Sequence, residues 1–163
     1  MPASTAQPSA RPLAVLFACG RNSIRSPIAA GLFGQMFGRT IYVGSAGSRK
    51  GELDPFAVAV MAEIGVDISR HKPMTFEELD ELEGLNFDLI VTLAPEAHHR
   101  ALELTRMSAV DVEYWPTADP TDVEGSREQR LNAYREVRDQ LLNRIRERFT
   151  GRRPGNELSL IHI

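Results

Sequence analysis

The sequence contains one cysteine, which lies six residues before an arginine in the segment Cys19-Gly-Arg-Asn-Ser-Ile-Arg25. A cysteine thiolate is a strong nucleophile, and a guanidinium group binds two oxygens of a tetrahedral anion through its planar fork. When both groups lie in one short loop, the nucleophile is held beside the anion that it attacks. This spacing therefore predicts covalent attack on a phosphate-like oxyanion.

The residues on either side of the loop predict a strand and a helix that hold it. Leu13–Ala18 reads LAVLFA, an apolar run typical of a parallel strand that is buried on both faces. Ser26 and Pro27 predict a helix start, with the serine as N-cap and the proline at the first helical position. Gly38 is expected to end this helix. Apolar residues recur between these ends at helical spacing, at Ile28, Leu32, Phe33 and Met36.

A loop between a buried strand and a helix start is a favourable anion site. Its N–H groups lack intrahelical partners, and the helix dipole adds positive potential. The same field favours the thiolate form of Cys19, which is the nucleophilic form. The alternative is an inert buried thiol beside a solvated arginine, which is the ordinary fate of each residue type. The position of both residues in this loop favours the reactive interpretation.

Strands and helices alternate along the rest of the chain. Three further strands are predicted at Ile41–Ala46, Phe87–Leu93 and Asp111–Trp115. Helices are predicted to begin at Asp54-Pro55, at the capping box Thr75–Glu78, at Pro95, and at the capping box Ser126–Gln129. This alternation predicts a parallel sheet with right-handed crossovers and a ligand at the carboxyl ends of its strands.

Two of these helices have a clear apolar face. The helix after Asp54 is expected to bury Ala57, Val60, Met61 and Ile64 and to end at Gly65. The last helix carries a longer apolar stripe made of Leu131, Tyr134, Val137, Leu141, Ile145 and Phe149.

Composition indicates one globular domain, since 163 residues at 42% hydrophobic and 25% charged suffice for a full core. We expect a flexible leader at residues 1–12, a catalytic domain at 13–149 and an irregular tail at 150–163. The net charge of -3 and the short apolar runs give no argument for nucleic acid or a membrane as partner. One cysteine without a signal peptide favours the cytoplasm. No histidine pair has ligand spacing, so neither a metal nor a cofactor is expected.

The segment VLFACGRNSIRSPIAAGLF resembles the signature of the low-molecular-weight protein tyrosine phosphatase family, a cysteine, five residues and then Arg-Ser-Pro. The segments IYVGSAGS, VMAEIGVDISRH, FDLIVTL and YWPTADP match the family in the same order, so the resemblance covers about residues 13–149. It implies an α/β fold: a single three-layer domain whose four-stranded parallel sheet, in order 2-1-3-4, is flanked by helices. Thioredoxin-coupled arsenate reductases share this superfamily.

The resemblance also implies roles for particular residues. Cys19 would be the nucleophile, Arg25 would bind the phosphoryl oxygens, and Asp119 would be the general acid. An aspartate before a proline is also a common turn residue, and Asp122 is the next candidate for the acid. The remaining residues of the phosphate loop would be Gly20, Arg21, Asn22, Ser23, Ile24 and Ser26.

Three residues outside direct catalysis also match positions of the family. The Ser26 hydroxyl would form a hydrogen bond with the thiolate. Ser45 and His71 match positions whose side chains support Asn22, which tolerates a left-handed backbone. These matches predict that side chains outside the phosphate loop, those of Ser45 and His71, support its conformation.

The chain departs from the family pattern at three places. Arg21 stands where the family usually has glycine, and Ile24 stands where many members have a second cysteine. The loops at residues 47–53 and 120–125 lack the aromatic residues with which tyrosine phosphatases hold a phenyl ring. The nature of the physiological substrate therefore stays open between a phosphorylated protein and a small phosphomonoester.

Three functions remain after this comparison. The first is hydrolysis of a phosphomonoester, either phosphotyrosine in a protein or another aryl phosphate, through a cysteinyl phosphate. Arsenate reduction is the second, and it needs an external thiol because one cysteine cannot relay a disulfide outward. The third is a non-catalytic module that binds a phosphorylated ligand. We predict the cysteine-dependent phosphatase.

Overall fold

The computed structural model describes residues 12–151 of the chain. The leader expected at residues 1–12 lies outside the described residues except for its last position, and the tail expected at 150–163 except for its first two. No helix within residues 12–151 has the length and apolar character needed to cross a membrane.

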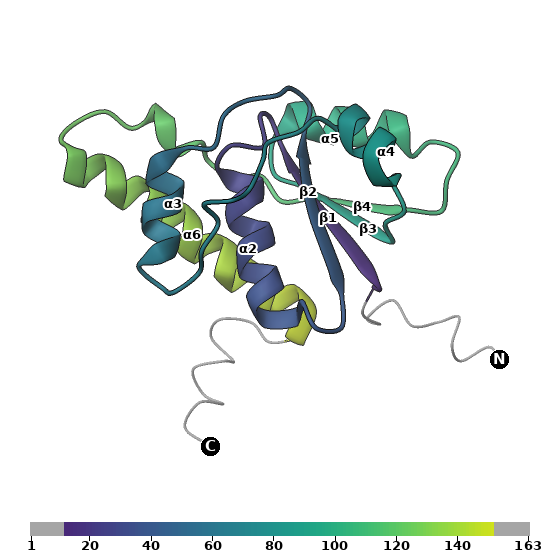
Figure 1. Ribbon diagram of the computed structural model, residues 1–163, viewed down its shortest axis with the longest axis horizontal. Helices are drawn as coiled ribbons and strands as arrows, with labels where there is room; N and C mark the ends of the chain where they lie inside the picture. The colour runs from purple at the N-terminus through teal and green to yellow at the C-terminus, as the bar shows by residue number, and fades with distance from the viewer. Residues whose placement is uncertain (1–11, 152–163) are drawn as a thin grey trace, which may run out of the picture.

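The core of the fold is a four-stranded parallel sheet (Figure 1). Its strands are β1 (Ala14–Cys19), β2 (Tyr42–Gly47), β3 (Leu89–Thr92) and β4 (Asp111–Tyr114). The order β2-β1-β3-β4 confirms the predicted topology. Cys19 pairs with Gly47 and Ala18 with Thr92, so the strands end together at one edge of the sheet.

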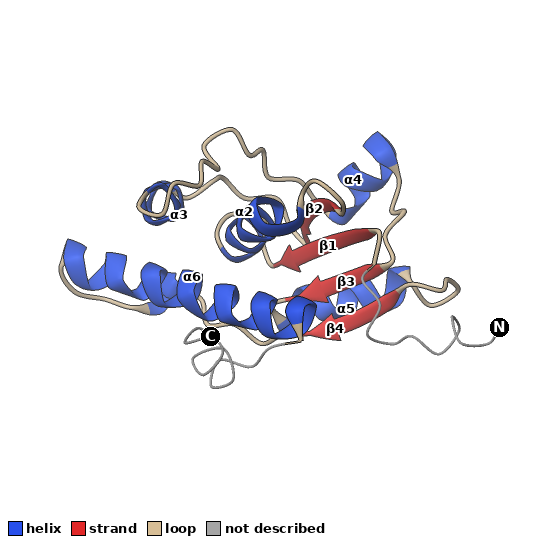
Figure 2. Cartoon of the chain, turned by 90° about the horizontal axis from the view of Figure 1, so that it is seen from below, coloured by secondary structure: helices blue, strands red, loops and turns tan. Residues whose placement is uncertain are grey.

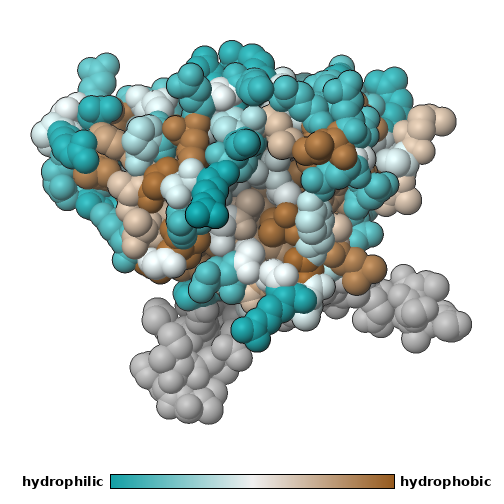
Figure 3. Space-filling view, in the orientation of Figure 1, coloured by the Kyte–Doolittle hydropathy of each residue, from teal (hydrophilic) through white to brown (hydrophobic). Residues whose placement is uncertain are grey.

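Helices cover both faces of the sheet and complete the predicted three layers (Figure 2). They are α2 (Arg25–Phe37), α3 (Pro55–Ala62), α4 (Phe76–Glu83), α5 (Pro95–Leu104) and α6 (Arg127–Thr150), with a short 3-10 turn η1 at Pro120–Asp122. Helices α2, α3 and α6 gather on one side, while α4 and α5 lie on the other. Polar side chains dominate the upper edge of the molecule in Figure 3, where the strands end in Figure 1.

Alternate residues of β1 supply the two halves of the core, because successive side chains of a strand point to opposite faces. Val15 and Phe17 pack with α2 and α6, and Leu16 and Ala18 pack on the side of α4 and α5. All four are completely buried. The predicted run of apolar residues is therefore a central strand that is covered on both faces.

Local capping chemistry starts three helices as predicted. Asp54 accepts a hydrogen bond from the Phe56 N–H, and both expected capping boxes, at Thr75 and Ser126, are complete. The prediction for Ser26 was wrong: α2 begins at Arg25, so Ser26 lies inside its first turn and makes no cap. The Ser26 hydroxyl instead lies 3.0 Å from Cys19 Sγ, so it contacts the sulfur and not a backbone N–H of the helix.

The end of α3 also differs from the prediction. The helix stops at Ala62, and Ile64 is 44% exposed rather than buried. Gly65 turns the chain with a left-handed φ of 80°. Val66 and Ile68 beyond this turn provide the burial that periodicity had assigned to Ile64. The prediction thus continued the helical spacing of apolar residues to Ile64, although the helix ends at Ala62.

Candidate active site

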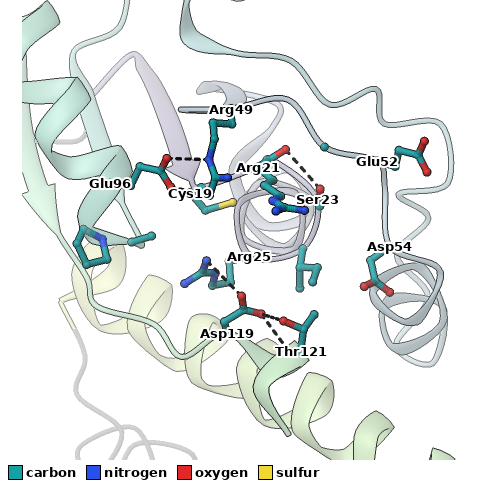
Figure 4. Close-up of a pocket in the computed structure, with 15 residues that line it drawn as sticks. Cys19, Arg21, Ser23, Arg25, Arg49, Glu52, Asp54, Glu96, Asp119 and Thr121 are labelled. Carbon is teal, nitrogen blue, oxygen red and sulfur yellow. Dashed lines mark hydrogen bonds and ion pairs between the residues drawn. The ribbon is translucent and has the colours of Figure 1, made fainter. Parts of the chain in front are cut away.

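A pocket of about 800 Å³ opens at the carboxyl ends of the strands (Figure 4). Cys19, Arg25 and Asp119 all line it, so the structure brings together the three residues predicted to do the chemistry. Cys19 is only 2% exposed, which places its sulfur at the floor of the pocket. Any group that reacts with this sulfur must enter the pocket.

Two groups of one serine contact the Cys19 sulfur. The Ser26 N–H donates to Sγ at 3.4 Å, and the Ser26 hydroxyl lies 3.0 Å from the same atom. Asn22 Nδ2 donates to Ser26 Oγ at 2.8 Å, which leaves the hydroxyl proton for another acceptor. A thiolate carries no proton, so the hydroxyl must donate to it. The site is therefore arranged to stabilise a negative sulfur at the start of α2.

The backbone of the phosphate loop changes direction at Asn22. Its φ of 58° is left-handed, a conformation found at no other non-glycine residue among residues 12–151. Its side chain is fully buried, and Oδ1 accepts the Met74 N–H at 3.0 Å. These bonds fix the amide and hold the strained turn in place.

His71 approaches Asn22 as the resemblance implied, whereas Ser45 does not. His71 Nε2 lies 3.1 Å from the Asn22 carbonyl oxygen. Burial lowers the pKa of His71 although this hydrogen bond acts to raise it, so the ring is neutral at pH 7 and Nε2–H donates. Ser45 pairs with Phe17 in the sheet, and within the described chain it forms no hydrogen bond with Asn22. The expectation for Ser45 was wrong: the Ser26 hydroxyl and the Met74 N–H are the hydrogen-bond partners of the Asn22 side chain.

Arg25 connects the phosphate loop to the loop that carries Asp119. Its Nη1 donates to the Thr117 carbonyl oxygen at 2.8 Å, and Nη2 lies 4.0 Å from Asp119 Oδ2. The Thr121 N–H and hydroxyl donate to Asp119 Oδ1 at 2.9 and 2.7 Å. The side chains of Arg25 and Asp119 therefore meet at one wall of the pocket.

The protonation of Asp119 follows from these contacts. Burial acts to raise the pKa of Asp119, but the two hydrogen bonds from Thr121 and the charges of Arg25 and Arg21 hold it below its ordinary value. The group is thus a carboxylate at neutral pH in this structure. A doubly charged phosphoryl group bound beside it would raise its pKa, as a general acid requires.

The segment after β2 supports the phosphate loop from outside. The Ser48 N–H donates to the Cys19 carbonyl at 3.2 Å, and the Arg49 N–H donates to the Gly20 carbonyl at 2.8 Å. A side chain at Gly47 would place Cβ 2.7 Å from the Asn22 nitrogen, so the close approach requires glycine there. The two loops therefore form one unit.

These observations can be set beside known proteins. A family model described as "Low molecular weight phosphotyrosine protein phosphatase" matches residues 14–152. The chain belongs to this family. Its members are cysteine-based enzymes, and Cys19 is the single cysteine of this sequence.

Relatives of this phosphatase family carry two kinds of name. A Bacillus subtilis (strain 168) protein named arsenate reductase is 35% identical over 133 residues, which are 82% of this chain and 92% of that protein. A structure titled "An arsenate reductase in the phosphate binding state" is 27% identical, covers 85% of this chain and 97% of its own, and has a TM-score of 0.65. A low molecular weight protein tyrosine phosphatase from T. tengcongensis is 25% identical, with 80% and 92% coverage and a TM-score of 0.63.

The pocket of this family member also contains an ion pair that sequence reasoning missed. Arg49 Nε and Nη2 donate to the two carboxylate oxygens of Glu96 at 2.8 and 3.2 Å. Both residues line the pocket (Figure 4). Arg49 follows the end of β2 and Glu96 follows the end of β3, which is the edge where a ligand was expected. Their positions just after two predicted strands could have identified both residues from the sequence.

No aromatic side chain lines the pocket among residues 12–151. Its apolar lining comes from Ile24, Ala94 and Pro95. Thr121 and Asp119 line it from the last loop, whereas Asp122 is not among the lining residues of the described chain. The same residues gather no group of three or more His, Cys, Asp or Glu side chains that could hold a metal ion.

Proposed function

We propose that the chain hydrolyses phosphomonoesters through a cysteinyl phosphate on Cys19. The observation that carries the proposal is the arrangement around the Cys19 sulfur: the Ser26 N–H and hydroxyl both contact it, and Cys19 lines the same pocket as Arg25. Such an arrangement favours a negative nucleophile and a tetrahedral anion at adjacent positions.

In the first step the loop N–H groups and Arg25 bind the phosphoryl oxygens. The Cys19 thiolate attacks phosphorus, and an S–P bond forms as the bond from phosphorus to the leaving oxygen breaks. Asp119 gives its proton to that oxygen, which avoids the release of an alkoxide or phenoxide. The products of this step are an alcohol or phenol, the cysteinyl phosphate and an Asp119 carboxylate.

In the second step a water molecule attacks the cysteinyl phosphate. The Asp119 carboxylate takes a proton from the water, and the S–P bond breaks to return the thiolate. Inorganic phosphate leaves and Asp119 is again protonated. The cycle consumes one water molecule and needs neither a metal nor a redox cofactor.

Arsenate reduction is a second candidate, because the first relatives reported above are named arsenate reductases. Arsenate takes up two electrons to become arsenite, and two thiols supply them by forming a disulfide. Cys19 would displace one arsenate oxygen, which leaves as water. An external thiol would then attack the Cys19 sulfur, release arsenite and form a mixed disulfide, since the sequence has one cysteine. A second external thiol would regenerate Cys19.

One pair of assays on the purified chain separates the two candidates. We expect phosphate release from phenyl phosphate by the wild type and none by Cys19→Ala. Arsenate-dependent oxidation of glutathione, without phosphate release, would instead identify a reductase. If neither activity depends on Cys19 while phosphate still binds, the chain is a binding module and the proposal is wrong.

A further inference from the structure

Three arginines line the pocket, and their side chains differ in what they contact. Arg25 donates to the Thr117 carbonyl, and Arg49 is paired with Glu96. The guanidinium group of Arg21 has neither a hydrogen bond nor an ion pair with any part of the chain that the structure describes. A free guanidinium group beside an anion pocket is therefore available to a ligand.

The start of the Arg21 side chain is held by the segment after β2. A Cβ added at Gly51 would lie 2.8 Å from Arg21 Cβ and 2.3 Å from Ser23 Oγ, so only a glycine allows this approach. Arg21 itself is not among the residues with a left-handed φ, so an arginine fits here without backbone strain. The fold thus accommodates Arg21 at a position where the family usually has glycine.

The charge of Arg21 acts across the pocket. Arg21 and Asp119 lie on opposite sides of it in Figure 4, and the positive charge of Arg21 contributes to the low pKa of Asp119. In the proposed reaction Asp119 must reach the leaving oxygen. The group attached to that oxygen therefore emerges from the pocket between Asp119 and Arg21.

We propose that Arg21 binds a second anionic group carried by the leaving group of the substrate. This inference rests on the proposed function, because it concerns the leaving group of that reaction. The preferred substrates are phosphomonoesters with a carboxylate or a second phosphate close to the phosphoryl group that is transferred. The planar fork of Arg21 suits either anion.

Kinetics with matched substrates tests this binding site. We compare kcat/KM for phenyl phosphate with that for a phenyl phosphate bearing a ring carboxymethyl group, and for phosphotyrosine peptides flanked by Asp with those flanked by Ala. In the wild type we expect a preference of about two- to fivefold for the carboxylated partner of each pair, since exposed ion pairs are of this strength. The small-molecule and peptide pairs tell whether a small ester or an acidic protein segment supplies the anion.

Variants assign the preference to Arg21. Arg21→Gln should abolish it, and Arg21→Lys should keep part of it. Arg39→Gln is the control, because Arg39 is an exposed arginine beyond the opposite end of α2, about 20 Å from the pocket. The preference should also shrink in about 0.5 M salt. A preference absent from the wild type, or unchanged in Arg21→Gln, would overturn the proposal.

Calorimetry separates this proposal from the proposed function, because binding needs no turnover. In a Cys19→Ser background, the carboxylated phenyl phosphate should bind several-fold more tightly than phenyl phosphate, and Arg21→Gln should remove the difference. If this holds while the wild-type chain shows no phosphatase activity, the Arg21 site stands and the proposed reaction fails. If both ligands bind equally, or neither binds, the Arg21 site is wrong whatever the activity.

Discussion

At the scale of residues, the site depends on how a few polar atoms share their hydrogen bonds. Asn22 occupies one lone pair of the Ser26 hydroxyl, so the proton of that hydroxyl is directed to the Cys19 sulfur or to a distant carbonyl at 3.5 Å. The sulfur contact is the shorter one. A serine inside the first turn of a helix thus contacts the Cys19 sulfur instead of capping the helix.

The role of Asp119 can be tested through the leaving group. Protonation matters most for a poor leaving group, so Asp119→Ala should slow phenyl phosphate by about 10²–10⁴-fold and an activated nitrophenyl ester much less. The measurement is the slope of log rate against leaving-group pKa, taken where formation of the phosphoenzyme limits the rate. Asp122→Ala, in the same loop but outside the pocket lining, is the control. Equal slopes for the wild type and Asp119→Ala would exclude Asp119 as the acid.

At the scale of elements, the sequence was most informative where local chemistry decides the structure. The capping boxes at Thr75 and Ser126 and the apolar run of β1 were predicted correctly, because each depends on neighbouring residues. The Ser26 prediction failed because tertiary contacts with Cys19 outweighed the local capping preference. The Arg49–Glu96 pair was missed since it joins loops that only the folded sheet brings together.

The phosphate loop should be sensitive to its single left-handed asparagine. Asn22→Ala removes the partners of the Met74 N–H and the Ser26 hydroxyl and leaves alanine at a φ of 58°. We expect a loss of about 2–4 kcal/mol in the free energy of unfolding. Asn22→Gly should recover about 1 kcal/mol, because glycine adopts this conformation freely. Urea denaturation measures both, and a glycine variant no more stable than the alanine one would mean that the turn is unstrained.

We expect His71 to make the free energy of unfolding sensitive to acid. Burial lowers its pKa in the folded state, so the unfolded chain binds the proton more tightly and acid favours unfolding. This contribution is complete above the unfolded pKa of about 6.5 and is lost as pH falls below it. Stability measured between pH 8 and pH 5 should therefore fall less steeply in His71→Gln than in the wild type. The exposed His99 provides the control, and a His99→Gln variant should keep the wild-type slope.

At the scale of the whole molecule, an aromatic cluster joins the last helix to the sheet and to α2. Phe149 lies 4.9 Å from Phe33 and 6.4 Å from Trp115 between ring centroids, and Phe33 lies 5.6 Å from Phe17 on β1. Helix α2, which follows the phosphate loop, thus packs against the C-terminal part of α6. Sequence periodicity predicted the apolar stripe of α6, but the partners of each ring became visible only in the fold.

The cluster makes a prediction for stability. Phe149 is 6% exposed, so Phe149→Ala should cost about 3–5 kcal/mol in the free energy of unfolding through the cavity that it leaves. Phe56, which is only partly buried beneath Arg127 and Arg130, should cost clearly less when replaced by alanine. Urea denaturation followed by circular dichroism compares the two variants. Equal losses would show that the cluster at Phe149 is not a major contributor to stability.

The covalent intermediate tests the account most directly. The chain is mixed with an activated aryl phosphate, quenched in acid within milliseconds, digested and analysed by mass spectrometry. We predict one phosphoryl group on Cys19 in the wild type, none in Cys19→Ala, and a larger trapped amount in Asp119→Ala, in which the attack of water lacks its base. Turnover of the ester without phosphate on Cys19, or with phosphate on another residue, would contradict the cysteinyl phosphate mechanism.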